Sequence, residues 1–210
     1  MVGTIGPLVQ GALPRLRHRL EITALFVAGF LGGAVIMFIV LHLLGLAAQL
    51  QVLPLTSRRA IAAAGLVALA LMDVWARSRG AYCPLGLRRQ TPRSLRRRHS
   101  LRALASVWGF DTGLAMTTFR VTAATWGAML LTMLGLSGWQ TGVAYGMAFA
   151  IPVAILMWTH RAGRMAVTQE PGDPGLGELL GMRPAWQARS AMLLAAGAVV
   201  LIGELLYGAA

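Results

Sequence analysis

The sequence predicts an all-α, polytopic membrane protein with five full spans and one broken or re-entrant segment, six in all, forming a single membrane domain over residues 1–210. Of its 210 residues, 57% are hydrophobic and only 12% are charged, and the mean hydropathy is +0.66. Soluble domains carry about 25% charged residues, so this composition is typical of a membrane protein. The 19 basic residues are all arginines, and they gather in short segments between apolar runs. That distribution is typical of cytoplasmic loops, so despite a net charge of +12 we expect no nucleic-acid partner.

Four apolar runs approach the length of about 20 residues that a membrane-spanning helix needs. In chain order they are Ile22–Leu50, Ala60–Trp75, Trp139–Trp158 and Ala191–Tyr207. The first is long enough to tilt in the bilayer, and the second is somewhat short. The third has a tryptophan at each end, where aromatic residues contact the membrane interface.

The segment Leu101–Leu136 is too long for one span. As a single helix it would extend about 54 Å, whereas the hydrocarbon core of a bilayer is about 30 Å thick. We therefore expect two elements with a break near Arg120. The second element, "VTAATWGAMLLTMLGL", is the short fifth span. The first, Leu101–Phe119, either crosses the membrane or enters it and returns on the same side.

Arginines predict the orientation of the chain. Residues 77–102 contain nine arginines and no acidic residue, so this loop is expected in the cytoplasm, together with the N-terminus. The protein is then expected in the cell membrane, with anionic lipid bound at the Arg77–Arg102 loop. The loop separates a first half, about residues 1–76, from a second half, about residues 103–210. Three arginines in residues 160–185 favour the re-entrant alternative for Leu101–Phe119.

Three pairs of glycines have the GxxxG spacing that lets two helices approach closely in lipid. They are Gly29 and Gly33, Gly109 and Gly113, and Gly142 and Gly146. We expect these positions to lie at contacts between helices.

Two opposite charges lie in "WGFDTGLAMTTFRVTAATWG", residues 108–127. Asp111 and Arg120 are nine residues apart, so on one straight helix they point to opposite faces and cannot form an ion pair. The face of Asp111 also carries small and hydroxyl-bearing residues, among them Thr118, Thr122 and Thr125. One interpretation is that these residues line a wet path through the membrane. The other is that Asp111 caps a helix while Arg120 extends to the lipid headgroups.

Two further acids differ in their setting. Asp73 lies four residues before Arg77, so we expect a local ion pair between them. Glu204, in "VVLIGELLYG", has no local partner and is a second candidate for a buried path residue. His42 has no second ligand at helical spacing, so we expect it to be packed and hydrogen-bonded without a metal.

Cys83 is the only cysteine, which excludes an intramolecular disulfide. It lies in "AYCPLGLRRQ", where neighbouring arginines would lower the pKa of the thiol and make it a candidate reactive thiol. The alternative is a cysteine that is merely tolerated in a loop. No phosphate-binding glycine loop, nucleophile elbow or cluster of metal ligands is found, so the sequence predicts no enzyme, catalytic residue, metal or cofactor.

Two stretches of the chain resemble the CcdA/DsbD transmembrane family. The first is "GTIGPLVQGALPRLRHRLEITALFVAGFLGGA"; the second is "CPLGLRRQTPRSL" followed by "VWGFDTGLAMTTFRVTAATW". Both lie within Gly3–Trp158. The resemblance implies a fold of two related halves, and "GTIGPL" (Gly3–Leu8) aligns without a gap to "GFDTGL" (Gly109–Leu114).

Members of this family transfer electrons with a pair of cysteines, one in the broken segment of each half, and this chain has neither. Thiol–disulfide exchange needs two sulfurs, so one loop cysteine would need a partner's cysteine. The resemblance therefore implies the same scaffold without its redox chemistry. The leading hypothesis is small-solute transport, or an accessory role in envelope or cytochrome c maturation with a membrane or envelope protein partner. The alternative is a non-transporting structural subunit of a larger membrane complex.

Overall fold

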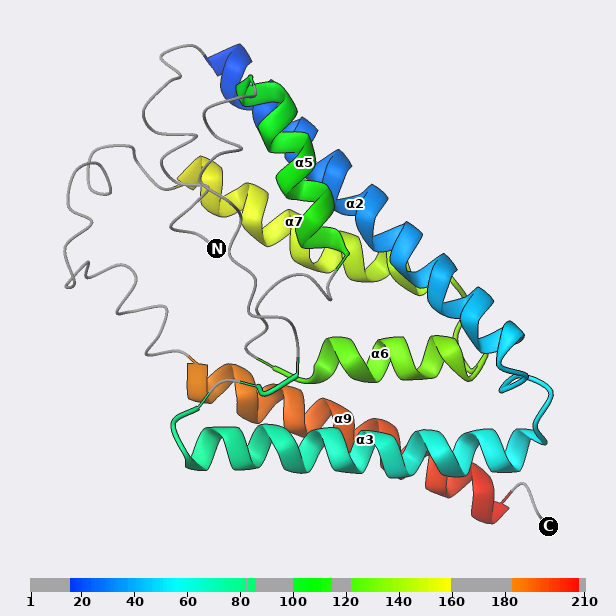
Figure 1. Ribbon diagram of the computed structural model, residues 1–210. Helices are drawn as coiled ribbons and strands as arrows, with labels where there is room; N and C mark the ends of the chain where they lie inside the picture. The colour runs from blue at the N-terminus through cyan, green and yellow to red at the C-terminus, as the bar shows by residue number, and fades with distance from the viewer. Residues whose placement is uncertain (1–15, 82, 86–99, 115–121, 160–182, 208–210) are drawn as a thin grey trace.

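A computed structural model describes residues 16–81, 83–85, 100–114, 122–159 and 183–207 of the chain. These residues form helices and no strand, so the predicted all-α class is confirmed (Figure 1). The helices are α2 (Leu16–Ala47), α3 (Leu55–Ser78), α5 (Leu101–Gly113), α6 (Ala124–Met133), α7 (Thr141–Thr159) and α9 (Arg183–Tyr207).

Three of these helices are long and apolar enough to cross a membrane: α2 over Leu20–Ala47, α3 and α9. They correspond to three of the expected spans and indicate a membrane protein by their length and composition. Five full spans are not supported. Helix α6 has 10 residues, a rise of about 15 Å against a core of about 30 Å.

Helix α6 is short because a glycine ends it. Gly135 has φ of 65°, a left-handed conformation that favours glycine. Its amide donates to the carbonyl of Thr132 at 3.1 Å, and the amide of Leu136 donates to the carbonyl of Leu131 at 2.9 Å. These two bonds form the Schellman motif that closes the C-terminus of a helix. The apolar run continues to Leu136, so hydropathy alone overestimates the length of this element.

The helices form two layers (Figure 1). In one layer α2 packs against α5 and α7, and in the other α3 packs against α9. Helix α6 lies between the layers and contacts α2, α3, α7 and α9. In the first layer the core is aromatic, built from Phe26, Phe30 and Phe38 of α2 with Tyr145 of α7.

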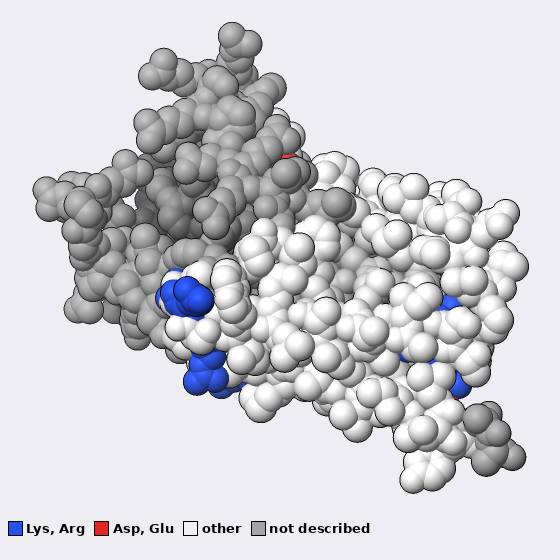
Figure 2. Space-filling model, turned by 60° about the horizontal axis from the view of Figure 1, so that its bottom comes forward, with Lys and Arg blue, Asp and Glu red and all other residues white. Residues whose placement is uncertain are grey.

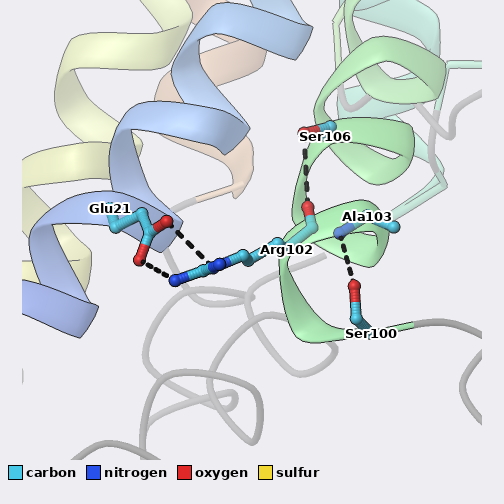
Figure 3. Close-up of polar contacts among 5 residues, drawn as sticks. All are labelled: Glu21, Ser100, Arg102, Ala103 and Ser106. Atoms are coloured by element: carbon cyan, nitrogen blue, oxygen red, sulfur yellow. Dashed lines mark hydrogen bonds and ion pairs between the residues drawn. The ribbon is translucent and has the colours of Figure 1, made fainter.

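Helix α5 runs parallel to the first half of α2. Its start is fixed by an ion pair in which Arg102 Nε lies 2.9 Å from Glu21 Oε1 and Arg102 Nη2 lies 3.0 Å from Glu21 Oε2 (Figure 3). Its first turn is capped by Ser100, whose hydroxyl accepts the amide of Ala103 at 3.3 Å. Its last residue, Gly113, lies against the backbone of Phe30, about midway along α2.

The predicted break between two elements is present, with α5 ending at Gly113 and α6 beginning at Ala124. Helix α6 begins beside Asp73, close to the C-terminal end of α3. The first residues of α5 and α6 therefore lie toward the same side of the molecule, on the left in Figure 1. Helix α5 reaches only about halfway along α2, and residues 115–119, the rest of the segment expected to cross or re-enter, lie outside the described residues.

The outer surface of the α3–α9 layer is apolar. Figure 2 shows a wide uncharged area with arginines toward its two ends. Large apolar side chains are more than half exposed here, including Leu71 at 63% and Leu193 at 70%. Water-soluble monomers rarely expose continuous apolar areas of this kind, whereas lipid-facing helices do.

Candidate functional site

The most deeply buried charged side chain among the described residues is Asp73 of α3, with no exposed surface. Its carboxylate accepts the backbone amide of Ala123, with the nitrogen 2.9 Å from Oδ1 and 3.0 Å from Oδ2. The hydroxyl of Ser190, in α9, donates a short hydrogen bond to Oδ2. We refer to Asp73, Ala123, Ala124 and Ser190 as the Asp73 junction, because these residues join α3, α6 and α9.

The junction satisfies the N-terminus of α6. The first amides of a helix have no partner within the helix, and the N-cap residue Ala123 has no side chain that can accept them. The Asp73 carboxylate accepts the amide of Ala123, and the Ser190 hydroxyl accepts that of Ala124 at 3.1 Å. The carboxylate also lies at the positive end of the α6 dipole, where a negative charge is favourable.

The C-terminus of α6 has a matching partner on the same neighbouring helix. Arg58 Nη1 of α3 donates to the carbonyl of Leu134 at 3.2 Å. Arg58 and Asp73 are 15 residues apart, which places them about 60° apart around the axis of α3. One face of α3 therefore places a cation at the negative end of α6 and an anion at its positive end.

Two other polar groups lie close to the junction. Gln187, fully buried in α9, donates its amide to the carbonyl of Ala81 at 2.9 Å and so fixes the chain just after α3. Cys83 is 3% exposed and belongs to the same apolar cluster as Ala123.

The prediction that the Cys83 thiol has a lowered pKa is wrong. Burial raises the pKa, and the nearby negative charge of Asp73 raises it further, outweighing the opposite effect of the Leu85 backbone amide. A buried thiol with a raised pKa is less reactive than a loop cysteine beside arginines. The alternative of a non-reactive cysteine agrees better with this geometry.

The expected polar stripe does not lie on one helix. Asp111 is half-buried in α5, about half a turn from the glycines that face α2. Thr122 precedes α6 and Thr125 is buried within it, so neither shares a continuous helix with Asp111. Thr118 and Arg120, the other two residues of the prediction, lie outside the described residues.

The contacts of Asp73 and Glu204 also differ from those expected from the sequence. Asp73 bonds to Ala123 and Ser190 in place of Arg77, which is exposed. The reason is orientation, since the Asp73 side chain faces α6 and α9. Glu204 is exposed and pairs across helices, with its Oε2 3.0 Å from Nε of Arg59. The sequence showed no local partner for Glu204 because the partner lies on α3.

The GxxxG glycines all lie at close contacts of α2. A Cβ at Gly29 or Gly33 would overlap a backbone carbonyl oxygen of α5, and a Cβ at Gly109 or Gly113 would overlap one of α2. A Cβ at Gly142 of α7 would lie 2.9 Å from the carbonyl oxygen of Ala34. At Gly146 the nearest atom would be a side-chain carbon of Leu31, at 2.7 Å.

The sequence reasoning missed the junction because its partners have weak signals. Two of its four groups are backbone amides, whose hydrogen-bond partners cannot be inferred from residue type. Serine is a common residue type, and Ser190 lies just outside the expected span Ala191–Tyr207. The one usable signal was Asp73 itself, the only acid in the run "AIAAAGLVALALMDVW", but the nearby Arg77 offered a simpler explanation.

No known protein family, no curated protein and no solved structure matches the chain. The resemblance to the CcdA/DsbD family therefore stays a prediction from the quoted sequence patterns. Its proposed repeat includes Gly3–Leu8, which lies outside the described residues.

Proposed function

We propose that this protein moves a small solute across the cell membrane, on a CcdA-like scaffold without the redox cysteine pair, in support of envelope or cytochrome c maturation. Its polar site is the Asp73 junction. The observation that carries the proposal is a fully buried carboxylate at the start of a short helix that follows a half-length helix. Discontinuous helices whose N-termini point at anionic groups of the substrate are a recurring plan of transporter sites, and here the N-terminus of α6 points at a carboxylate of the protein.

The choice of a carboxylate supports this function over a purely structural cap. Asparagine and serine cap helix N-termini about as well as aspartate. Burying an ionised carboxylate, however, carries a desolvation penalty of several kcal/mol, which a neutral cap avoids. Ionisable residues within membrane segments are therefore candidates for ion or solute pathways.

A second candidate function is that of a non-transporting structural subunit. The observation that favours it is the glycine-lined packing of α2 against α5 and α7, which brings the backbones of these helices into close contact. In that case Asp73 serves only to cap α6.

Complementation of a deletion strain separates the two functions. Asp73→Asn keeps an oxygen that accepts the Ala123 amide but removes the charge, whereas Asp73→Ala removes both. The read-outs are cytochrome c content and the thiol state of exported proteins, with the amount of membrane-inserted protein as the control.

A transport site predicts that Asp73→Asn accumulates normally and fails to rescue. A structural cap predicts that Asp73→Asn rescues fully, while Asp73→Ala lowers the amount of protein. If the deletion strain itself has neither phenotype, the maturation role is wrong.

A further inference from the structure

We propose that Asp73 is a proton-binding site, and that uptake of a proton releases the N-terminus of α6 from α3 and α9. This inference rests on the proposed transport function and identifies the proton as its coupling ion. The site consists of the Asp73 carboxylate, the Ser190 hydroxyl and the first amides of α6.

The position of Asp73 along α3 gives a proton a short route. Five residues separate it from Ser78, the last residue of the helix, a distance of about 7.5 Å along the axis. The chain that covers this end, including Ala81 and Cys83, is held over the junction by the bond from Gln187. The carboxylate is thus closed off from solvent but lies close to the end of the bundle.

Proton uptake removes the charge that strengthens the hydrogen bonds of the junction. The carboxylate and one proton become a carboxylic acid, so the negative charge opposite the α6 dipole disappears and one oxygen becomes a donor. A proton on Oδ2 points at Ser190 Oγ, which already accepts the Ala124 amide and has donated its own hydrogen to that oxygen. The Ser190 hydrogen must then turn to another acceptor, and the hydrogen bonds to the first amides of α6 weaken because Asp73 no longer carries a charge.

The elements packed around Asp73 place little charge near it. Helix α6 contributes backbone amides, and α9 contributes the neutral side chains of Ser190 and Gln187. The chain after α3 contributes the Cys83 thiol, which burial keeps protonated at neutral pH. Of the arginines at this end of α3 and α9, Arg77 and Arg79 are exposed and Arg183 lies near Gly80. Arg189, next to Ser190 in the chain, lies 5.6 Å from the ring of Trp186.

Release of α6 would affect both layers of the molecule. Helix α6 contacts α3 and α9 on one side and α2 and α7 on the other. It is the element through which the two layers pack, so a change at its first turn reaches the interface between them. A proton-dependent contact at this position is suited to coupling proton uptake to movement of one layer against the other.

Hydrogen exchange of α6 tests the proposal without a known solute. The full-length protein is placed in lipid nanodiscs, and exchange in residues 122–133 is followed by mass spectrometry between about pH 3 and 8, a range that extends below the ordinary aspartate pKa of about 3.9. Each rate is divided by the intrinsic rate at that pH. The variants are wild type, Asp73→Asn and Glu204→Gln, which removes a charge from the exposed contact between α3 and α9. Residues 101–113 of α5 are the internal reference.

At neutral pH, α6 of Asp73→Asn should exchange about tenfold faster than wild type, because the charge at the helix N-terminus is missing. The difference should disappear in acid as wild-type Asp73 takes up a proton, while Glu204→Gln matches wild type throughout. Equal protection in wild type and Asp73→Asn at every pH overturns the proposal, as does a difference that persists to the acid limit. If Asp73→Asn does not fold, the wild type alone decides: protection of α6 relative to α5 must fall in acid, and a constant ratio overturns the proposal.

The two proposals fail in different ways. If Asp73→Asn does not rescue the deletion strain but α6 protection is independent of pH, the transport site stands and the proton site is overturned. If α6 protection follows the expected pH course but Asp73→Asn rescues fully, the proton site stands and the transport function is overturned.

Discussion

The contact between α2 and α5 gives the sharpest stability prediction, because adjacent glycines of α2 lie in opposite settings. A Cβ added at Gly33 would overlap the carbonyl oxygen of Phe110 and lie 3.1 Å from the backbone nitrogen of Leu114. A Cβ added at Gly32 would meet nothing within 4 Å. The substitutions Gly33→Ala and Gly32→Ala therefore differ only in whether α5 lies against the new methyl group.

The expected loss of stability in Gly33→Ala depends on which atoms the added Cβ would contact. The atoms facing Gly33 belong to the backbone, so no side chain can rotate aside and α5 must move outward by about 1 Å. Overpacking of this kind costs about 1 to 3 kcal/mol. Gly32→Ala should instead gain up to about 1 kcal/mol from the higher helix propensity of alanine. Because alanine at either position has the same gain in helix propensity, that gain cancels, and we expect the free energies of unfolding of the two variants to differ by about 1 to 3 kcal/mol.

Unfolding by increasing fractions of SDS in mixed micelles, followed by circular dichroism, measures this difference. Gly33→Ala should unfold at a clearly lower SDS fraction than wild type, and Gly32→Ala at an equal or higher one. If the two variants unfold together, α2 and α5 do not approach through their glycines, and the placement of α5 along the first half of α2 is wrong.

Two further predictions concern charge and pH. Glu21→Gln should lower the free energy of unfolding by less than about 1 kcal/mol, because the ion pair of Glu21 with Arg102 is largely exposed. High salt should remove this difference between the variant and wild type. A loss of several kcal/mol that does not depend on salt would contradict this. Burial raises the pKa of Cys83 above its ordinary value of 9.0. Below pH 9.0 the thiol is protonated in both the folded and the unfolded chain, so its contribution to the free energy of unfolding is constant. That contribution is lost as the pH rises through the pKa of the folded state. The difference in melting temperature between wild type and Cys83→Ala, which includes the packing lost with the buried sulfur, should therefore be constant below pH 9.0 and change only above it, a range in which the chain has no lysine to titrate. A difference that changes around neutral pH would show that the thiol is not buried.

Hydropathy predicted the three long helices well because their lengths depend on apolar composition. The differences lie at their ends. Helix α3 begins at Leu55 and not near Ala60, because Arg58 is accommodated by the carbonyl of Leu134 and Arg59 by Glu204. Helix α9 likewise begins eight residues before the apolar run, at Arg183. Polar residues extend both helices because a partner on another helix satisfies them, and the sequence of one segment does not contain that partner.

The candidate site could not be derived from the sequence for a related reason. The stripe argument for Asp111 assumed one helix through residues 111–125, and the break between α5 and α6 removes that assumption. The acid that is buried, Asp73, appeared to be paired with Arg77. A spacing of four residues brings two side chains onto one face of a helix, but it does not decide whether that face meets lipid, water or another helix. Here α6 and α9 cover Asp73, while Arg77 is exposed.

The polar residues of α3 nevertheless follow a rule that a sequence can show. A helix shorter than the membrane leaves unpaired amides at one end and unpaired carbonyls at the other, and lipid satisfies neither. Helix α3 supplies both partners from one face, Asp73 for the start of α6 and Arg58 for its end. Their separation of 15 residues corresponds to about 22 Å, which matches a ten-residue helix with its two caps and the reach of an arginine. An acid and an arginine on one face of an apolar helix, at such a distance, therefore predict a short antiparallel helix packed between them.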